Sequence, residues 1–384
     1  MLIFISAAAN AWGMQSYLDT WGRPLASQVQ ILSYEELPAL THYRRGTFIF
    51  ADIEVLSSSQ ALMAADIWAK LNGQGCRLLN HPVRTMRRYQ LLRTLHARRE
   101  NQFQIYRLTD TVCPARFPVL LRLENEHRPF TDLLRDQGEL DRAMLGLLVR
   151  GYPLRDALMV EFCDTSDESG LFRKYSAFIV GDQIVPRHLV FSNQWLQKTP
   201  DLLDDDKLRE EHDYLTTNPH RAWLERVFRL AGVEYGRIDY GVIDGKPQVW
   251  EINTNPVVMM EPHKYAQSHL PAQEFFATHI RRSFEAADDR STDGDGTVTI
   301  ARPLMQRRVG WLHGVASRAL DAWRHAGADH PRVFSAATRV LAVLRLQRAI
   351  LRLGSRGQSR KEVADREIVE QRGPGRDEDS WPAS

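Results

Sequence analysis

Short apolar runs alternate with helix-like segments along the first 80 residues of the chain. Runs such as "LIFIS" at 2–6 and "VQILS" at 29–33 are rich in β-branched and aromatic side chains, which predicts strands. Residues 58–75 begin with serines that can cap a helix and end in glycines that can stop one. Because strands and helices alternate, we expect a small α/β unit with a mostly parallel sheet, followed at 81–110 by a basic, helix-like segment.

A second region, 111–285, combines longer strand-like runs with helical segments. A helix at 219–231 is expected to have Asn218 as its N-cap, Pro219 in its first turn and Gly232 beyond its end. The segment "VGDQIV" carries Gly-Asp at a bend and predicts a hairpin. Further strands are predicted at 117–124, 157–164, 172–182 and 183–192, and one or two helices at 131–151.

The C-terminal part of the chain falls into three segments of different composition. Turn-forming residues dominate 286–308, which predicts a linker. Residues 309–354 have the pattern of a basic helical hairpin, and 355–384 contain so few apolar residues that we expect disorder. The arginines of the hairpin leave two interpretations open: docking on an anionic membrane surface or a partner protein, and packing against the protein's own body.

Residues 237–256, "RIDYGVIDGKPQVWEINTNP", predict two strands joined by a tight turn. Even-numbered positions are mainly apolar, as expected of the side that faces a core: Ile238, Tyr240, Val242, Trp250 and Ile252. Odd-numbered positions include polar side chains: Arg237, Asp239, Glu251 and Asn253. The hairpin is therefore expected to place two carboxylates, an amide and an arginine on one face.

The length of the turn decides which residues of this hairpin face each other. We expect a three-residue loop, Asp244–Lys246, whose glycine adopts the positive backbone angle that such a loop requires. Asp239 then lies opposite Glu251. Arg237 lies opposite Asn253 on the same face. A two-residue loop would turn Glu251 to the other face, because a shift of one residue reverses the faces of a strand, and the parity of the apolar residues favours the longer loop.

Two facing carboxylates repel each other, since cross-strand neighbours lie about 4.5–5.5 Å apart at Cβ. A divalent cation would relieve the repulsion, and Mg²⁺ favours carboxylate oxygens together with the phosphates of a nucleotide. The amide oxygen of Asn253 would complete a set of hard oxygen ligands with Asp239 and Glu251. The alternative is a surface hairpin with a polar outer face, in which Arg237 neutralises one acid. The residues alone leave both interpretations open.

Composition excludes several classes of protein. Fifty Lys and Arg residues against 48 Asp and Glu give a net charge of +2, so global charge points neither to nucleic acid nor to membrane. Cys76, Cys113 and Cys163 form no close pair, which argues against a disulfide framework and a zinc site. No P-loop, HExxH or GxSxG motif occurs. The first residues predict a strand rather than a signal peptide, and no window reaches the ~18 apolar residues of a membrane span, so we expect a cytoplasmic protein.

The segments "RIDYG" and "VWEINTNP" resemble the metal-binding strands of the ATP-grasp superfamily, in which an R-x-D-[FY] strand precedes an E-[IV]-N-x-x-P strand. The resemblance covers about residues 1–285 and implies an α/β fold, with α+β character in the lid and a C-terminal helical extension beyond the ATP-grasp part. It implies a pre-ATP-grasp domain at 1–110 and an ATP-grasp domain at 111–285. Within the latter, the lid would take up about 111–195 and the metal-binding core about 196–285.

The resemblance also implies the roles of individual residues. Asp239, Glu251 and Asn253 would coordinate Mg²⁺ (or Mn²⁺) that bridges the phosphates of ATP. Arg237 would assist a phosphate or an acyl-phosphate intermediate. The strand "ALMVEFCD" resembles the hinge that meets adenine. The remaining expected contacts are Arg122, Lys174 and Arg187 for phosphates or substrate, and Glu161, Phe162 and Cys163 for adenine.

Two features depart from the family pattern. Arg88 and Tyr89 stand near the place where an Asp-Lys pair often occurs, and arginine holds phosphate through a planar fork rather than a point charge. The lid has no glycine-rich phosphate loop, and "LENEHRPFTDLL" contains His127 and Arg128 instead. Both departures affect how phosphate would be held.

The function that the resemblance implies is an ATP- and Mg²⁺-dependent ligase that joins a carboxylate to an amine, or to a thiol, through an acyl phosphate. Two alternatives stay open. One is a kinase of the same fold that phosphorylates a hydroxyl. The other is a non-catalytic ATP-binding scaffold, which the two departures motivate. The expected partners are small-molecule or peptide carboxylates and amines, and the sequence identifies neither.

Overall fold

A computed structural model describes residues 1–124, 129–149, 152, 154–196, 202–288 and 296–302. These residues belong to one compact unit, Met1–Arg307. The predicted helical hairpin at 309–354 and the predicted tail at 355–384 lie outside the described residues. Within the described part of the chain, no helix has both the length and the apolar character needed to cross a membrane.

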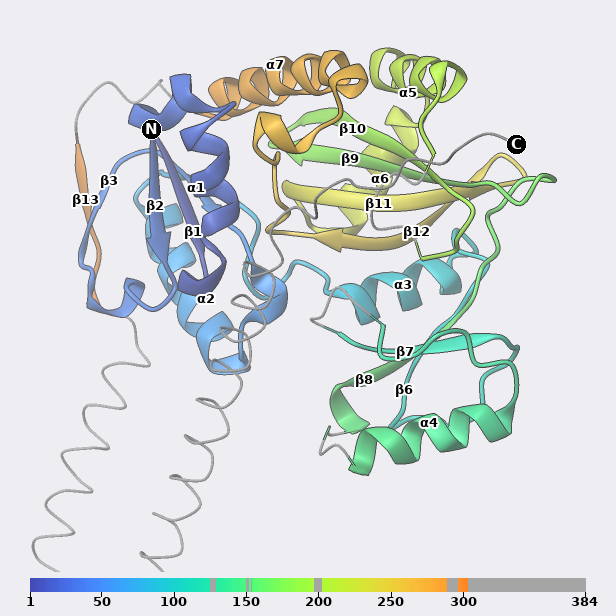
Figure 1. Ribbon diagram of the computed structural model, residues 1–384. Coiled ribbons are helices and arrows are strands. Elements are labelled where there is room, and N and C mark those ends of the chain that lie inside the picture. The colour runs from blue at the N-terminus through green and yellow to red at the C-terminus, as the bar shows by residue number, and fades with distance from the viewer. Residues whose placement is uncertain (125–128, 150–151, 153, 197–201, 289–295, 303–384) are drawn as a thin grey trace, which may run out of the picture. The chain divides into compact units, whose positions relative to one another are not determined.

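A four-stranded parallel sheet opens the chain, with the strand order β2-β1-β4-β5 (Figure 1). Its strands are β1 (Leu2–Ser6), β2 (Val29–Ser33), β4 (Thr47–Phe50) and β5 (Arg77–Leu79). The helices of this part are α1 (Trp12–Asp19) and α2 (Ser58–Gly73). Ser57 caps α2 through its side chain, as the run of serines predicts. β1 and β4 are buried along their whole length, as is usual for central strands of a parallel sheet.

Part of the segment predicted as a linker is folded. α7 (Leu270–Ala287) extends past residue 286, and β13 (Thr297–Thr299) pairs antiparallel with β3 (His42–Arg44). The side chain of Val298 joins the apolar cluster on one side of the parallel sheet. The chain therefore returns to its N-terminal part after α7, which corrects the prediction of a linker over the whole of 286–308.

A three-stranded antiparallel sheet follows, with the order β6-β8-β7. It consists of β6 (Ile105–Arg107), β7 (Val119–Leu123) and β8 (Ala157–Glu161). Residues of α4 (Gln137–Val149) pack against this sheet in one apolar cluster. α3 (Arg88–Ala97) precedes the sheet and is the predicted basic helix. The strands expected at 117–124 and 157–164 are confirmed, although both are shorter than predicted.

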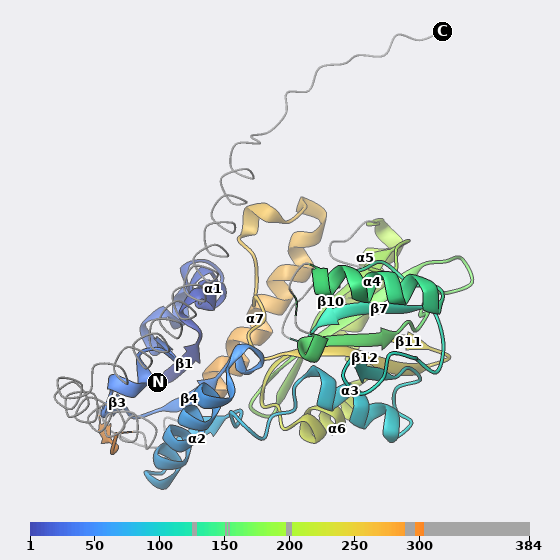
Figure 2. The same cartoon turned by 90° about the horizontal axis from the view of Figure 1, so that it is seen from below.

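The third sheet is antiparallel, with the order β10-β9-β11-β12. Its strands are β9 (Phe172–Val180), β10 (Gln183–Ser192), β11 (Tyr235–Ile243) and β12 (Lys246–Asn253). One face packs on α7 and on residues of the parallel sheet. The opposite face packs on α3 and on α6 (Arg221–Ala231), and Figure 2 shows these two helices on the far side of the sheet from α7. α5 (Asp205–Thr217) packs against the edge strand β10.

The helix boundaries near residue 218 differ from the prediction. Asn218 ends α5 in the left-handed region (φ 45°), and its backbone N–H donates to the carbonyl of Tyr214. α6 starts after His220, whose side chain makes no capping hydrogen bond, and Gly232 ends α6 at φ 64° as predicted. The expected N-cap role of Asn218 is wrong, because asparagine suits the left-handed end of one helix as well as the start of the next.

The turn of the β11–β12 hairpin also differs from the prediction. It has two residues, Asp244 and Gly245, with φ angles of 51° and 72°, the combination that favours a tight hairpin. Lys246 pairs with Ile243 instead of lying in the bend, so the three-residue loop is wrong.

The pairing at the other end of the hairpin is nevertheless the predicted one. Asp239 lies opposite Glu251, and the register shifts between Asp239 and Tyr240, whose partner is Val249. Trp250 is therefore the extra residue of a β-bulge in β12. The bulge adds the residue that the short turn removes, and it returns Glu251 to the face that carries Asp239.

The parallel α/β part is followed along the chain by a small antiparallel sheet and by an antiparallel sheet that ends in the charged hairpin (Figure 1). The lid predicted at about 111–195 includes β9 and β10, but both strands belong to the sheet of β11 and β12, which corrects the boundary near residue 195. This mixed architecture confirms the predicted α/β class and is consistent with the ATP-grasp fold.

Candidate active site

A cavity of about 810 Å³ is lined by residues of the two larger antiparallel sheets and by residues of the segments that follow β1 and β4. Small-molecule sites in proteins typically have volumes of about 300–1,000 Å³, so this cavity lies at the large end of that range. The predicted site residues that line it are Arg122, Glu161, Phe162, Cys163, Lys174, Arg237, Asp239, Glu251 and Asn253. Residues more than 130 positions apart in the sequence thus face one cavity, which is what the resemblance requires of them.

Asp239 lies on β11 among cationic and hydroxyl donors. Arg237 donates from Nε to Oδ1 at 2.8 Å and from Nη2 to Oδ2 at 3.1 Å, and the hydroxyl of Ser176 donates to Oδ1 at 2.7 Å. The Lys174 ammonium lies 3.7 Å from Oδ2. Burial acts to raise the pKa of Asp239, but the charges of Arg237 and Lys174 outweigh burial and hold that pKa below its ordinary value. Asp239 is therefore a fixed, ionised carboxylate.

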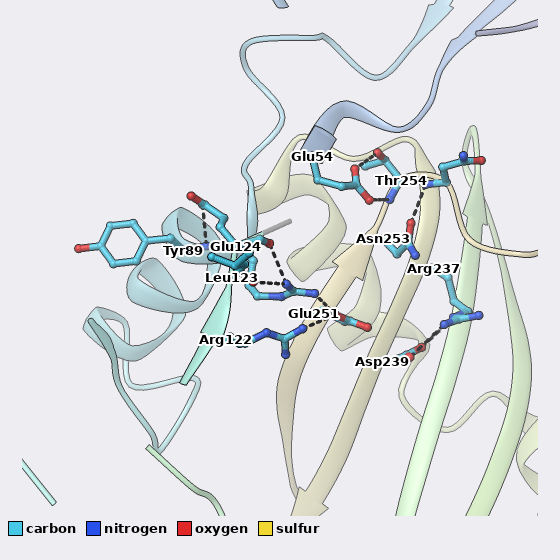
Figure 3. Close-up of polar contacts among 12 residues, drawn as sticks. Glu54, Tyr89, Arg122, Leu123, Glu124, Arg237, Asp239, Glu251, Asn253 and Thr254 are labelled. Carbon is cyan, nitrogen blue, oxygen red and sulfur yellow. Dashed lines mark hydrogen bonds and ion pairs between the residues drawn. The ribbon is translucent and has the colours of Figure 1, made fainter. Parts of the chain in front are cut away.

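Glu251, directly opposite on β12, is paired with a different set of cations (Figure 3). Arg88, the first residue of α3, forms an ion pair with Oε2, and the guanidinium of Arg122 on β7 lies 3.6 Å from the same oxygen. Arg88 also donates to the carbonyl of Glu124 at 2.7 Å. Arg88, which stands near the place where the family pattern often has an Asp-Lys pair, thus reaches the candidate site. It connects the β11–β12 hairpin to the three-stranded sheet.

The end of β12 is held by residues that precede α2. The backbone N–H of Thr254 donates to Glu54 at 2.9 Å, and its hydroxyl donates to the same carboxylate and accepts from the N–H of Ile53 at 2.9 Å (Figure 3). Next to it, the Oδ1 of Asn253 accepts from the N–H of Asn255 at 2.7 Å. The side chain of Asn253 and the residue that follows it are therefore held in place.

The three predicted metal ligands offer the donor atoms that Mg²⁺ prefers. Two carboxylates and one amide oxygen line the cavity from neighbouring strands. Among the described residues, no three His, Cys, Asp or Glu side chains gather into a metal-binding group, so the predicted set depends on the amide of Asn253. The repulsion between Asp239 and Glu251 is relieved here by arginine and lysine side chains. The donor chemistry of these three side chains fits a magnesium ion.

The segment after β8 forms another wall of the cavity. The carboxylate of Glu161 accepts from the hydroxyl of Tyr106 at 2.7 Å, from the N–H of Gln104 at 3.0 Å and from Nε of Arg116 at 3.0 Å. The backbone N–H of Phe162 donates to the carbonyl of Pro118 at 2.9 Å. The side chain of Glu161 thus fixes the end of β8, and the backbone N–H of this residue donates to the carbonyl of Gln104 at 3.0 Å.

Arg187 is the predicted site residue that does not line the cavity. Its guanidinium donates to the carbonyl of Val258 at 3.2 Å, to Gln273 at 2.9 Å and to the hydroxyl of Tyr265 at 3.1 Å. It stands where the β9–β10 register shifts, between Pro186 and His188. The structure therefore gives Arg187 a structural role in place of the predicted ligand contact, because its guanidinium is buried and its hydrogen bonds go to Val258, Gln273 and Tyr265.

Several cavity residues carry no signal in the sequence. We call the residues contributed by the N-terminal α/β part the N-terminal wall, and they are Asn10, Trp12, Gly13, Asp52, Glu54 and Val55. They follow β1 and β4, so the ends of these parallel strands bring them together. Trp195 and Trp250 line other parts of the cavity. No spacing rule identifies such residues, since only the packing of separate segments places them in one site.

Comparison with known proteins gives structural matches only. No protein-family model matches the chain, and no curated protein matches its sequence. The D-alanine–D-alanine ligase of Bacillus anthracis, complexed with ATP, is 12% identical, with a TM-score of 0.41 over 75% of this chain and 98% of that protein. The RimK-domain ATP-grasp protein of Sphaerobacter thermophilus is 13% identical, with a TM-score of 0.42 over 74% of this chain and 99% of that protein.

A third match is the L-amino acid ligase of Bacillus licheniformis, which is 10% identical, with a TM-score of 0.37 over 77% of this chain and 76% of that protein. Two ligases and an ATP-grasp protein are thus among the solved structures to which the chain is similar.

Proposed function

We propose that this protein is an ATP- and Mg²⁺-dependent ligase that joins a carboxylate to an amine through an acyl phosphate. One observation carries the proposal: Asp239 and Glu251 face the same cavity from opposite positions on neighbouring strands, within reach of four cationic side chains. Those cations are Arg88, Arg122, Lys174 and Arg237. Such a mixture of hard anionic ligands and fixed cations suits a magnesium–polyphosphate complex.

Asp239, Glu251 and Asn253 would hold the metal ion, which when bound would neutralise charge on the phosphate oxygens of ATP. Arg88 and Arg122 now pair with Glu251, and each guanidinium can take a phosphate oxygen instead. In the same way, Lys174 and Arg237 pair with Asp239 from positions beside the metal ligands. On binding of the nucleotide, these four cations would thus change their partner from a carboxylate to a phosphate oxygen. No charge would be buried without a partner.

The reaction has two steps: the γ-phosphoryl group moves from ATP to a carboxylate oxygen, and an amine then replaces phosphate at the acyl carbon. A substrate carboxylate attacks the γ-phosphorus of ATP, the bond to the bridging oxygen breaks, and ADP leaves with the electron pair. An amine then attacks the acyl carbon and loses a proton, the bond from that carbon to the phosphate oxygen breaks, and inorganic phosphate leaves with the electron pair as the amide forms. The cations of the cavity favour the first step because they stabilise charge on the transferred group and hold the two reactants in line.

The test is the substitution Glu251→Gln, which keeps the size of the side chain and removes its charge. We expect substrate-dependent release of phosphate to fall about 100-fold or more, since the variant loses a metal ligand. The control is Glu225→Gln, which removes an exposed ion pair with Arg221 on α6, away from the cavity. The assay is MgATP turnover against pools of amino acids, peptides and other carboxylates.

Product analysis separates the proposal from its alternatives. A ligase releases one phosphate for each amide formed. A phosphorylated acceptor without free phosphate would replace the ligase assignment with a kinase. Tight binding of MgATP without turnover on any carboxylate pool would indicate a scaffold. Turnover by Glu251→Gln that equals that of Glu225→Gln would contradict the metal-site assignment.

A further inference from the structure

The N-terminal wall differs in charge from the rest of the cavity. Its ionisable residues are the carboxylates Asp52 and Glu54, whereas the lysine and arginines that line the cavity in the described part of the chain come from α3, β7, β9 and β11. Polyphosphate is attracted to the cationic walls. The N-terminal wall therefore suits a ligand other than polyphosphate, or the uncharged part of a ligand.

The polar groups of this wall are already held in place. Asp52 accepts from the N–H of Ala7 at 3.1 Å and from Nδ2 of Asn10 at 2.8 Å, and Glu54 accepts from Thr254. Burial raises the pKa of Glu54, although its hydrogen bonds with Thr254 act in the opposite direction. A further negative charge near these carboxylates would be unfavourable, so the wall disfavours a ligand with a second anionic group.

Large apolar side chains at the cavity are strongly exposed. Trp12 is 57% exposed, and Val55 in the same wall is 36% exposed. Leu196, which lines the cavity from the segment after β10, is also 36% exposed. Single exposed apolar residues are normal on a protein surface, but several around one cavity indicate a surface that a ligand covers.

The N-terminal wall also adjoins the metal end of the cavity. Glu54 holds Thr254, the residue that follows Asn253, and Nδ2 of Asn255 donates to the carbonyl of Asn10 at 3.2 Å. A molecule whose carboxylate lies beside Arg237 and Asn253 therefore has its remaining part directed along this wall. The volume of about 810 Å³ leaves room for such a molecule beside a nucleotide.

We propose that the carboxylate substrate is a monocarboxylate with a large apolar group, preferably aromatic, that packs on Trp12 and Val55. This inference rests on the proposed ligase function for the placement of the carboxylate. Trp12 is the specificity-determining residue, because an indole ring offers a broad face to an aromatic group. Small carboxylates leave this face exposed, and dicarboxylates bring a second charge close to Asp52 and Glu54.

The experiment measures binding without turnover. Equilibrium dialysis of the full chain, with Mg²⁺ and a non-hydrolysable ATP analogue, compares labelled phenylalanine, glycine and glutamate. We expect phenylalanine to bind most tightly, with about a tenfold increase of its Kd in Trp12→Ala and a smaller increase in Trp12→Phe, which keeps an aromatic face. Leu62→Ala is the control, because Leu62 is 56% exposed on α2 and does not line the cavity.

The outcomes separate this inference from the proposed function. The inference is overturned if glycine or glutamate binds as tightly as phenylalanine, if phenylalanine does not bind, or if Trp12→Ala and Leu62→Ala behave alike. MgATP turnover is measured in parallel. Turnover on small carboxylates that does not depend on Trp12 would keep the ligase and reject the apolar substrate. Binding of phenylalanine that depends on Trp12, without any turnover, would keep the apolar site and reject the ligase.

Discussion

The parallel sheet and the charged hairpin use their strands in different ways. β1 and β4 are buried from end to end, and their neighbours cover both faces. β11 and β12 instead bury one face on α3 and α6 and present charged side chains to a cavity on the other. In the first case an apolar run is enough to define the strand. In the second, function depends on register, because a shift of one residue would turn Glu251 away from Asp239.

This difference predicts that substitutions on the hairpin affect both stability and activity. Asp239→Ala should have the largest effect, since Asp239 is 4% exposed and its loss leaves Arg237 and Lys174 without their shared carboxylate. We expect the free energy of unfolding to fall by about 3–5 kcal/mol, and substrate-dependent ATP turnover to be lost. Chemical denaturation and a phosphate-release assay measure the two effects. Glu285→Ala, which removes an exposed pair with Arg281, should cost about 0–1 kcal/mol.

The pH dependence of stability gives an independent check on the same carboxylate. The pKa of Asp239 is lowered in the folded protein, so its contribution to stability is fully present above the unfolded pKa of about 3.9. That contribution is lost as the pH falls through the lower, folded pKa. The difference in unfolding free energy between the wild type and Asp239→Asn should therefore be constant near neutral pH and shrink below about pH 4. A difference that grows on acidification would contradict the ion pairs of Asp239.

The second largest effect should come from the bulge that sets the register. A Cβ at Gly241 would lie 2.7 Å from Cζ2 of Trp250 and 2.9 Å from the side chain of Thr165, so Gly241→Ala must displace the bulge residue. We expect a loss of about 1–3 kcal/mol in stability and weaker binding of MgATP, because both displaced side chains line the cavity.

The matched control is Gly73→Ala at the end of α2, where an added Cβ meets no atom within 4 Å. That substitution should leave MgATP binding unchanged and leave stability equal or slightly higher, since alanine favours a helix. Equal effects of the two substitutions on nucleotide affinity, measured by titration calorimetry, would mean that the bulge does not position the charged face.

The hairpin also shows how far the sequence could be used to predict the site. The parity of the apolar residues predicts that Asp239 lies opposite Glu251, and the structure confirms this pairing. The turn is one residue shorter than predicted, and the bulge at Trp250 adds one residue to β12, so the register at Glu251 is unchanged. Parity along a strand shows which face a residue occupies and does not show where an extra residue is inserted. Arg187 also stands at a register shift, and its buried guanidinium bonds to Val258, Gln273 and Tyr265 instead of lining the cavity, which no pattern along β10 indicates.

The rest of the site could not be predicted for a different reason. In the sequence Arg88 stands out only as a departure from a family pattern, because its ion pair with Glu251 depends on how α3 approaches β12. Trp12 and Glu54 reach the cavity because the ends of β1 and β4 lie beside it. Local patterns predict strands and helices because the spacing of apolar side chains along an element reflects its backbone geometry. The contacts of these cavity residues depend instead on packing between segments distant in sequence.

The smallest effect should come from the parallel sheet. Ile5 on β1 is fully buried in the apolar cluster on one side of that sheet, so Ile5→Val removes one methylene and leaves a small cavity. We expect a loss of about 0.5–1.5 kcal/mol in the free energy of unfolding and no change in the KM for ATP, since no polar group or register depends on this side chain. If Ile5→Val weakens nucleotide binding as much as Gly241→Ala does, the two sheets are not independent. The charged face would then depend on the packing of the parallel sheet as well as on the hairpin's own register.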